Sequence, residues 1–227
     1  MQDLTVRSES IQRLYNYYID ERLVVNRRYQ RKLVWSIDEK EAFIDSIAKS
    51  YPVPMILLAE NESVENNILE IIDGMQRLNA IVSFIENEFS LNGEYFDLET
   101  MAETKLKKDN KELTQKEPIL NRKKCADIVS YVFPTSTYKG ASEHEIDEVF
   151  RRINANGKHL SRQEIRQAGA ISGFADIVRK IASEIRGDVS LNDRVVLNNM
   201  KRISITSRNL DYGINVDDVF WVSSAII

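Results

Sequence analysis

The sequence predicts a mixed α/β (α+β) fold, in which an α/β portion reaches to about residue 135 and a helical portion follows. Two observations support this prediction. Compact apolar runs of strand length, Met55–Ala59 and Ile68–Ile72, lie between segments with helical spacing. Beyond them, Glu143–Ile153 and Phe174–Ile185 keep a helical period. We therefore expect one domain over residues 1–135 and a helical subdomain over residues 136–227.

The first expected elements are two helices with a short strand between them. Ser10–Asp20 has helical spacing, and Leu23–Val25 is a strand. Ser36, followed three residues later by Glu39, is a capping box that opens the second helix, and Tyr51–Pro54 ends it. The side chains expected to point inward are Ile11, Leu14, Tyr15 and Tyr18 in the first helix and Ile37, Ile44, Ile47 and Ala48 in the second.

The central segment predicts a buried strand, a helix and a hairpin. Ile68–Ile72 is apolar apart from one glutamate, as expected of a strand that is covered on both faces. Apolar residues then recur at helical spacing from Leu78 to Phe89. Asn92-Gly93, between two alternating segments, predicts a tight turn. We expect Cys125–Phe133 to form another strand.

The helical portion carries two further signals of helix ends. Gly157 suits a left-handed C-terminal cap, and Ser161–Glu164 is a second capping box. The last residues, Asp217–Ile227, look like an acidic-capped apolar helix that stops before its end. Because a natural domain seldom ends on exposed Ile-Ile, we expect this subdomain to be truncated and the chain to be a fragment of a longer protein.

Composition excludes several classes of protein. With 31 Lys and Arg against 35 Asp and Glu, the net charge of −4 argues against coating nucleic acid by bulk electrostatics, although a local basic patch is compatible with it. One cysteine and two histidines exclude an internal disulfide and a Cys/His zinc site. The chain has neither a signal-peptide pattern nor an apolar run of about 20 residues. We expect a cytoplasmic protein with no membrane partner.

The segment Asp73-Gly74-Met75-Gln76-Arg77 joins a buried strand to a helix and predicts an anion site. Glycine lets the chain turn sharply and lets a ligand come close. The first amides of a helix have no internal partner, and the helix dipole favours an anion there. Arg77, within the first turn, suits a phosphate held by two parallel hydrogen bonds. The alternative is an ordinary strand–helix corner in which Asp73 caps the helix and Arg77 is a surface residue.

Two other stretches carry residues suited to phosphate or base contacts. In Arg27–Trp35, four cations (Arg27, Arg28, Arg31 and Lys32) could hold phosphates while an aromatic ring stacks on a base. The alternative is a solvated strand edge with Trp35 in the core, which we favour for Trp35. In Phe150–Ser161, Arg152 and Asn154 precede a glycine turn, and Asn154 on its own is better explained as a turn-bonding residue.

Several familiar catalytic patterns are missing from the sequence. It contains no G-x-x-x-x-G-K-[ST] phosphate loop, no G-x-G-x-x-G and no H-E-x-x-H. Asp97 with Glu103-Thr104-Lys105 superficially matches a D…E-x-K nuclease site, but it lies in helical-looking charged sequence rather than on paired strands. We therefore assign no nuclease site to these residues.

Together the three stretches resemble the N-terminal domain of the GmrSD-type modification-dependent restriction enzymes and related phage-defence proteins. That family shows Gln-Arg before an aromatic-Trp segment, a capped helix with a Pro-x-Pro strand entry, an Asp-Gly-Gln-Gln-Arg-Leu signature and a Phe-x-Arg-Ile-Asn-x-x-Gly-x-x-Leu-Ser segment. The matching residues are Gln30, Arg31, Trp35, Ser36 to Pro54, Asp73, Gly74, Gln76, Arg77, Leu78, Phe150, Arg152, Ile153, Asn154, Gly157, Leu160 and Ser161. Four motifs in this order, over roughly residues 20 to 170, make the resemblance specific.

The resemblance implies a fold similar to ParB and sulfiredoxin, with a small mixed sheet and helices. It also implies binding of a nucleoside triphosphate (NTP) and, in several relatives, its hydrolysis coupled to control of a DNA-cutting domain. One departure is Met75, which replaces the first Gln of the signature. If that Gln orients water or contacts the nucleotide, hydrolysis is weakened while phosphate binding survives. The family's His-Asn-His-type nuclease site has no counterpart here, so DNA cleavage does not reside in this chain.

The leading hypothesis is therefore an NTP-binding, NTP-hydrolysing regulatory domain of an anti-phage restriction system. Its expected catalytic residues are Asp73, Gln76 and Arg77, with Asp73 also holding Mg²⁺ or its bound water. The expected nucleotide-binding residues are Gln30, Arg31, Gly74, Met75, Arg152 and Asn154. Expected partners are the nucleotide, DNA at a local basic patch, a nuclease domain downstream or on another chain, and further copies of the chain. A DNA-binding or modification-sensing module without NTP turnover is the first alternative, and a toxin–antitoxin or scaffolding module is the second.

Overall fold

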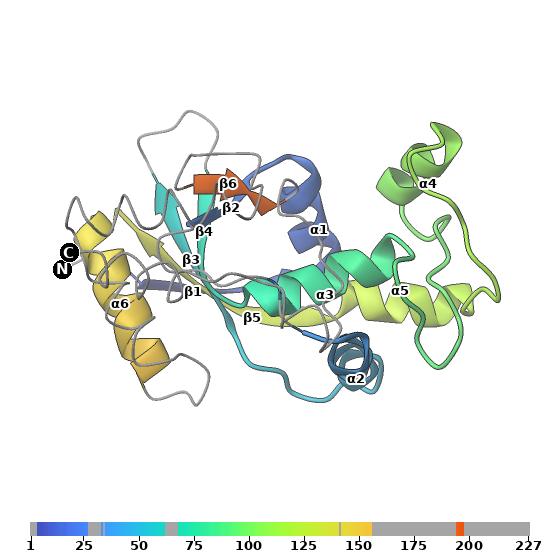
Figure 1. Cartoon of the computed structure of the whole chain (residues 1–227), viewed down its shortest axis with the longest axis horizontal. Helices are drawn as coiled ribbons and strands as arrows, with labels where there is room; N and C mark the ends of the chain where they lie inside the picture. Colours follow the sequence, from blue (N-terminus) through green and yellow to red (C-terminus); the bar gives the residue numbers. More distant parts are fainter. Residues whose placement is uncertain are drawn as a thin grey trace, which may run out of the picture.

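The computed structural model describes residues 4–26, 33, 35–61, 68–140, 142–155 and 194–197. These residues form a mixed sheet of six strands in the order β1-β5-β3-β4-β2-β6, with helices packed against it (Figure 1). The strands are β1 Leu4–Ser10, β2 Leu23–Asn26, β3 Ile56–Asn61, β4 Ile68–Asp73, β5 Val132–Lys139 and β6 Arg194–Val196. The helices are α1 Ile11–Ile19, α2 Ile37–Ala48, α3 Met75–Ile85, α4 Ala102–Asp109, α5 Arg122–Ser130 and α6 Glu143–Ala155.

The predicted fold class is confirmed, because helices pack on a sheet that mixes parallel and antiparallel pairs. Strands β2 and β4 are parallel, as are β3 and β5, whereas β1–β5, β3–β4 and β2–β6 are antiparallel. The likeness to ParB and sulfiredoxin stays a prediction, and so does a boundary at residue 135. The second capping box and the helix at Phe174–Ile185 lie outside the described residues.

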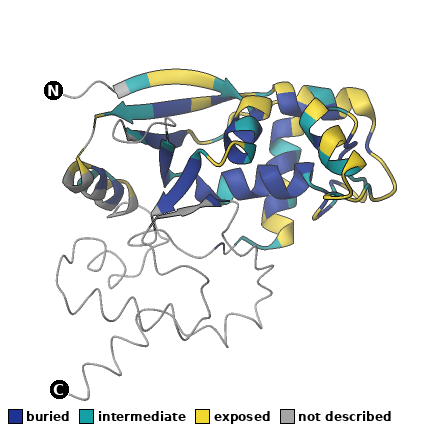
Figure 2. Cartoon of the chain, turned by 90° about the horizontal axis from the view of Figure 1, so that it is seen from above, coloured by how far each residue is buried: buried dark blue, intermediate teal, exposed yellow. Residues whose placement is uncertain are grey.

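Both faces of the sheet are covered, as the apolar sequence of β4 predicts. Successive side chains of a strand point to opposite faces. In β3, Ile56 and Leu58 join the large apolar cluster with α1, α2, α3 and α5, whereas Leu57 and Ala59 join a smaller cluster with α6. Figure 1 shows α6 on one side of the strands and the other packed helices on the opposite side. Strand β1 forms one edge of the sheet and is exposed at its middle residues, 6–8 (Figure 2).

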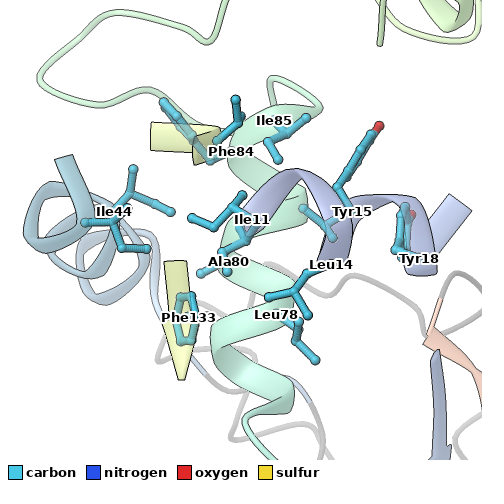
Figure 3. Close-up of a cluster of buried hydrophobic side chains, with 14 of the residues drawn as sticks. Ile11, Leu14, Tyr15, Tyr18, Ile44, Leu78, Ala80, Phe84, Ile85 and Phe133 are labelled. Atoms are coloured by element: carbon cyan, nitrogen blue, oxygen red, sulfur yellow. The ribbon is translucent and has the colours of Figure 1, made fainter. Parts of the chain in front are cut away.

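The larger cluster is centred on α1 and α3 (Figure 3). All four side chains predicted to point inward from α1 are buried. Helix α1 begins at the cap residue Ser10, whose side chain accepts a hydrogen bond from the Arg13 main-chain N–H. Helix α3 is buried along nearly all of its length and contacts both α1 and α2, so it forms the centre of the core.

Helix α2 begins with the predicted capping box, in which Ser36 and Glu39 exchange hydrogen bonds. Its inward face was predicted partly wrongly, because Ile37 and Ala48 are exposed. The buried face consists of Lys40, Phe43, Ile44 and Ile47. These positions have the spacing i, i+3, i+4, i+7 of one helical stripe, and Ile37 is the first residue of the helix.

The predicted strand at Cys125–Phe133 is wrong over most of its length. Residues Arg122–Ser130 form α5, and the strand β5 begins only at Val132. Cys125, Ile128 and Val129 are the buried residues of α5, with the spacing i, i+3, i+4 of a helix. The Asn121 side chain caps this helix by accepting from the Lys123 main-chain N–H. A helix therefore ends where the period-two pattern of β5 starts.

The predicted turn at Asn92-Gly93 is confirmed, but it does not join two full strands. Both residues have positive φ, 52° for Asn92 and 84° for Gly93, as the tight hairpin turns require. Leu91 and Glu94 form one isolated bridge across it.

No helix within the described ranges has both the length and the apolarity to cross a membrane.

Candidate functional site

The corner predicted to bind an anion lies where β4 ends and α3 begins. Asp73 is the last residue of β4, and Gly74 turns the chain with φ 104° into the first helical residue, Met75. An added Cβ at Gly74 would lie 3.1 Å from Ile56 Cγ1 and 3.4 Å from Arg77 Nη2. Glycine is therefore required here twice, once for the left-handed backbone and once for the close approach of β3.

No side chain caps the start of α3. In helices α1, α2 and α5 the side chain of the N-cap residue accepts a hydrogen bond from a main-chain N–H of the first turn, whereas Gly74 has no side chain to accept one. The first bond within α3 runs from the Leu78 N–H to the Gly74 carbonyl. Met75 can offer a ligand only its main-chain N–H, because its side chain is buried in the core.

Arg77 is held beside this helix end by two acceptors on one nitrogen. Its Nη2 donates to Asp73 Oδ2 at 2.7 Å and to the Met55 carbonyl at 2.9 Å. The Arg77 side chain is only 14% exposed, whereas that of Asp73 is 42% exposed. Arg77 Nε is buried and has no hydrogen-bond partner among the described residues. Asp73 therefore pairs with Arg77, and the helix-capping role considered from the sequence is not what the geometry shows.

Gln76 links the corner to the segment before α2. Its Oε1 accepts a hydrogen bond from the Trp35 main-chain N–H at 3.3 Å. The Trp35 ring packs edge-on against Phe43 with ring centroids 5.4 Å apart, and it is partly buried against the main cluster. The prediction that Trp35 packs into the core is confirmed, and its backbone is a contact of the site that the sequence did not indicate.

Sheet topology brings the end of β2 to the same edge as the corner. Strands β2 and β4 are parallel neighbours, with Val24 beside Glu70 and Val25 beside Ile71. The carboxyl ends of neighbouring parallel strands lie at the same edge of a sheet. Strand β2 ends at Asn26, the residue before Arg27, and β4 ends at Asp73. Gln30, Arg31 and the neighbouring cations lie outside the described residues.

A family model for the N-terminal domain of the GmrSD restriction endonuclease matches residues 11–171, which is more than half of the chain. The chain belongs to this GmrSD N-terminal domain family. It is therefore part of a restriction system. No curated protein and no solved structure matches the chain. The matched range contains the corner, the segment around Trp35 and all of α6.

Two expected site residues of this GmrSD N-terminal domain lie on α6. The Arg152 Nε donates to Glu148 Oε1 at 2.7 Å, and the Arg152 side chain is 78% exposed. The backbone of Asn154 is helical, but its side chain is outside the description. No contact described in the structure joins Arg152 to the corner, so the residues that the structure does bring together are Asp73, Gly74, Met75, Gln76 and Arg77.

A further contact of the GmrSD corner, the Met55 carbonyl, was not predicted. Met55 immediately precedes β3, and the antiparallel pairing of β3 with β4 places Leu57 beside Asp73. The Met55 carbonyl then accepts a hydrogen bond from Arg77 Nη2 at 2.9 Å. The one local signal was the Pro-x-Pro segment before Met55, which fixes where the strand starts.

The carboxylate content of the corner limits how a metal ion could be held. Within the described ranges, no group of three or more His, Cys, Asp or Glu side chains is arranged to hold a metal ion. Asp73 contributes one carboxylate, on a side chain that is 42% exposed. Mg²⁺ is commonly bound through one or two carboxylates together with phosphates of the substrate. The corner thus suits a cation that arrives with a polyphosphate better than a resident structural metal.

Proposed function

We propose that this chain is an NTP-binding, NTP-hydrolysing regulatory domain of an anti-phage restriction system, with its ligand site at the β4–α3 corner. The observation that carries the proposal is a helix start without a side-chain cap beside a largely buried guanidinium. Amides at a helix N-terminus and an adjacent arginine are the groups that hold phosphates. Membership of the GmrSD N-terminal domain family supports a role in restriction.

In this proposal each residue of the corner has one role. Gly74 and the amides of Met75 and Gln76 cradle phosphate, while Arg77 and Arg31 neutralise its charge. Asp73 would hold Mg²⁺ or its bound water, and Gln76, whose Oε1 accepts a hydrogen bond from the Trp35 N–H, would orient the attacking water. Gln30, Arg152 and Asn154 form the remaining wall. Mg²⁺ would supply charge neutralisation between phosphate oxygens.

Met75 makes slow turnover the expected behaviour. The family signature has Gln at this position, whereas the Met75 side chain is buried in the core. It therefore offers a ligand no polar group beyond its main-chain N–H. We propose that binding and hydrolysis control a nuclease domain, downstream or on a partner chain, because the sequence has no nuclease site of its own.

The test of this function is nucleotide binding by R77A. Titration calorimetry with ATP, GTP, CTP and UTP, each with Mg²⁺, is expected to show at least one ligand for the wild type. R77A should bind it about tenfold more weakly or worse, because a charge-assisted hydrogen bond contributes about 1.5–3 kcal/mol. Unchanged affinity in R77A would contradict the proposal.

The matched control is R13A. Arg13 also pairs with an acidic residue four positions earlier, Glu9, at 3.0 Å, but it lies on α1. The two variants lose the same charge from the same kind of ion pair. R13A should therefore bind nucleotide as the wild type does. Circular dichroism of both variants checks that any lost affinity does not come from unfolding.

A second candidate function is DNA binding or modification sensing without NTP turnover. The observation that favours it is the parallel pairing of β2 and β4, because β2 ends at the edge where Asp73 lies and is followed in the sequence by Arg27 and Arg28. Affinity for duplex DNA should then fall steeply with salt, as counterion release requires, and need no nucleotide. Charge-reversal variants R27E and R28E should abolish this binding while R13E does not.

A further inference from the structure

We propose that Asp73 is an exchangeable counter-ion: it occupies Arg77 in the free protein and is displaced from it when a polyphosphate binds. This inference rests on the proposed function, because it concerns the same corner. It adds a regulatory property, namely that the cation and the phosphate bind cooperatively through one carboxylate.

The first step of the argument is the number of hydrogens on one nitrogen. Arg77 Nη2 carries two hydrogens, and both are engaged, one by Asp73 Oδ2 and one by the Met55 carbonyl. A phosphate that is to accept from Nη2 must therefore displace one of these two acceptors. Until that happens, the guanidinium cannot offer its paired donors Nε and Nη2 to a ligand.

The second step identifies which acceptor leaves. The Met55 carbonyl belongs to the backbone directly before β3, whose pairing with β4 and β5 fixes it in place. The Asp73 carboxylate is on a short side chain that is 42% exposed and can rotate towards solvent. Asp73 is therefore the acceptor that can leave without a strand moving.

The third step is the unsatisfied donor next to Nη2. Arg77 Nε is buried and has no hydrogen-bond partner within the described part of the chain. A buried donor without an acceptor is costly, and an arginine that meets a phosphate through Nε and Nη2 satisfies both nitrogens at once. The free protein thus holds Arg77 in an incompletely satisfied state, which a two-oxygen anion would complete once Asp73 has moved aside and uncovered Nε.

The fourth step concerns charge. A polyphosphate that approaches Arg77 also approaches the Asp73 carboxylate, which is bound to the same nitrogen. The two negative charges repel each other. Asp73 released from Arg77 is then a carboxylate beside phosphate oxygens, the ligand combination that Mg²⁺ favours. Without a divalent cation Asp73 opposes the ligand, and with one it supports the ligand.

The experiment compares D73N with the wild type in binding inorganic tripolyphosphate, a probe without a base. In EDTA, D73N should bind about tenfold more tightly than the wild type, because the competing charge is gone while the side chain keeps its shape. With Mg²⁺, wild-type affinity should rise by a larger factor than that of D73N, which lacks the carboxylate. Titration calorimetry measures all four affinities.

The matched control is D45N. Asp45 pairs with Lys49 four residues later at 2.6 Å, so it is also an aspartate in an i, i+4 ion pair, but on α2. The same change of charge there should leave tripolyphosphate binding as in the wild type, in EDTA and in Mg²⁺. An equal gain in tripolyphosphate affinity in D45N and D73N would mean that the effect comes from net charge alone, and it would overturn the inference.

Two other outcomes separate the inference from the function on which it rests. If the wild type binds with Mg²⁺ but D73N in EDTA is no tighter than the wild type, Asp73 is not a competitor and only the inference fails. If neither protein binds tripolyphosphate or any of the four nucleotides under either condition, the proposed function fails and the inference fails with it.

Discussion

At the scale of single residues, the corner depends most on a missing side chain. Gly74 combines a left-handed backbone with a close contact to Ile56, from which an added Cβ would lie only 3.1 Å. A residue other than glycine therefore disturbs both the backbone and the β3 contact. Gly93 shares the first of these constraints, with φ 84°, but an added Cβ there meets nothing within 4 Å.

This difference predicts the effects of two matched substitutions. G93A should destabilise the protein by about 1 kcal/mol, the cost of a left-handed conformation for a residue with a Cβ. G74A should cost about 2–3 kcal/mol, because overpacking against Ile56 adds to that strain. Urea unfolding of both variants measures the difference. Equal losses in G74A and G93A would show that the approach of β3 to Gly74 does not constrain the corner.

At the scale of elements, α6 is attached to the sheet by a small apolar cluster. Phe150 and Ile146 on α6 pack against Leu57, Ala59 and Ile72 of the sheet. Phe150 is 5% exposed, whereas Ile153, one turn later on the same helix, is 42% exposed. Because the cluster contains few side chains, Phe150 should account for much of the attachment of α6.

We therefore expect F150A to destabilise the protein by about 3 kcal/mol, in the range for truncating a buried phenylalanine. I153A should change stability by less than about 0.5 kcal/mol, as exposed substitutions do. Hydrogen exchange would show faster exchange of the α6 amides in F150A than in I153A. Similar exchange in the two variants would mean that contacts other than this cluster hold α6.

Elements with their own sequence signals were predictable, and those defined by pairing were not. The capping box at Ser36 and the apolar run of β4 located α2 and a two-sided strand. Strand β1 gave no signal, because it is an exposed edge whose partner β5 lies more than a hundred residues away. The Asp73–Arg77 pair follows from local spacing, whereas the contacts of Arg77 with Met55 and of Gln76 with Trp35 depend on tertiary packing.

At the scale of the whole molecule, two kinds of interaction act in different regions. Apolar clusters join the sheet to the helices on both faces. At the end of the molecule away from α6, charged pairs connect the segment before α4 with α4 and α5 (Figure 1). Arg122 is central there, because its Nε contacts Asp97 Oδ2 at 2.7 Å and its Nη2 contacts Glu99 Oε2 at 3.0 Å.

These ion pairs lower the pKa values of Asp97 and Glu99. Burial of Asp97 acts to raise its pKa, but hydrogen bonds from Arg122 and the Glu99 main-chain N–H, with the charges of Arg122 and Lys108, outweigh burial and lower it. The pKa of Glu99 is lowered by its hydrogen bond from Lys108 and then by Arg122. A carboxyl whose pKa is lower in the folded than in the unfolded chain stabilises the fold above its unfolded pKa of about 4.

Acid should therefore weaken the protein through this network. As the pH falls from about 5 through the lowered pKa values of Asp97 and Glu99, the folded chain must take up protons that the unfolded chain accepts more readily, and the free energy of unfolding decreases. R122A should be less stable than the wild type at pH 7, and its stability should fall less on acidification.

R13A, which loses an arginine from the ion pair with Glu9, should keep the wild-type pH dependence. Urea unfolding between pH 7 and pH 3 measures this, and parallel curves for R122A and the wild type would show that Arg122 does not set the two pKa values.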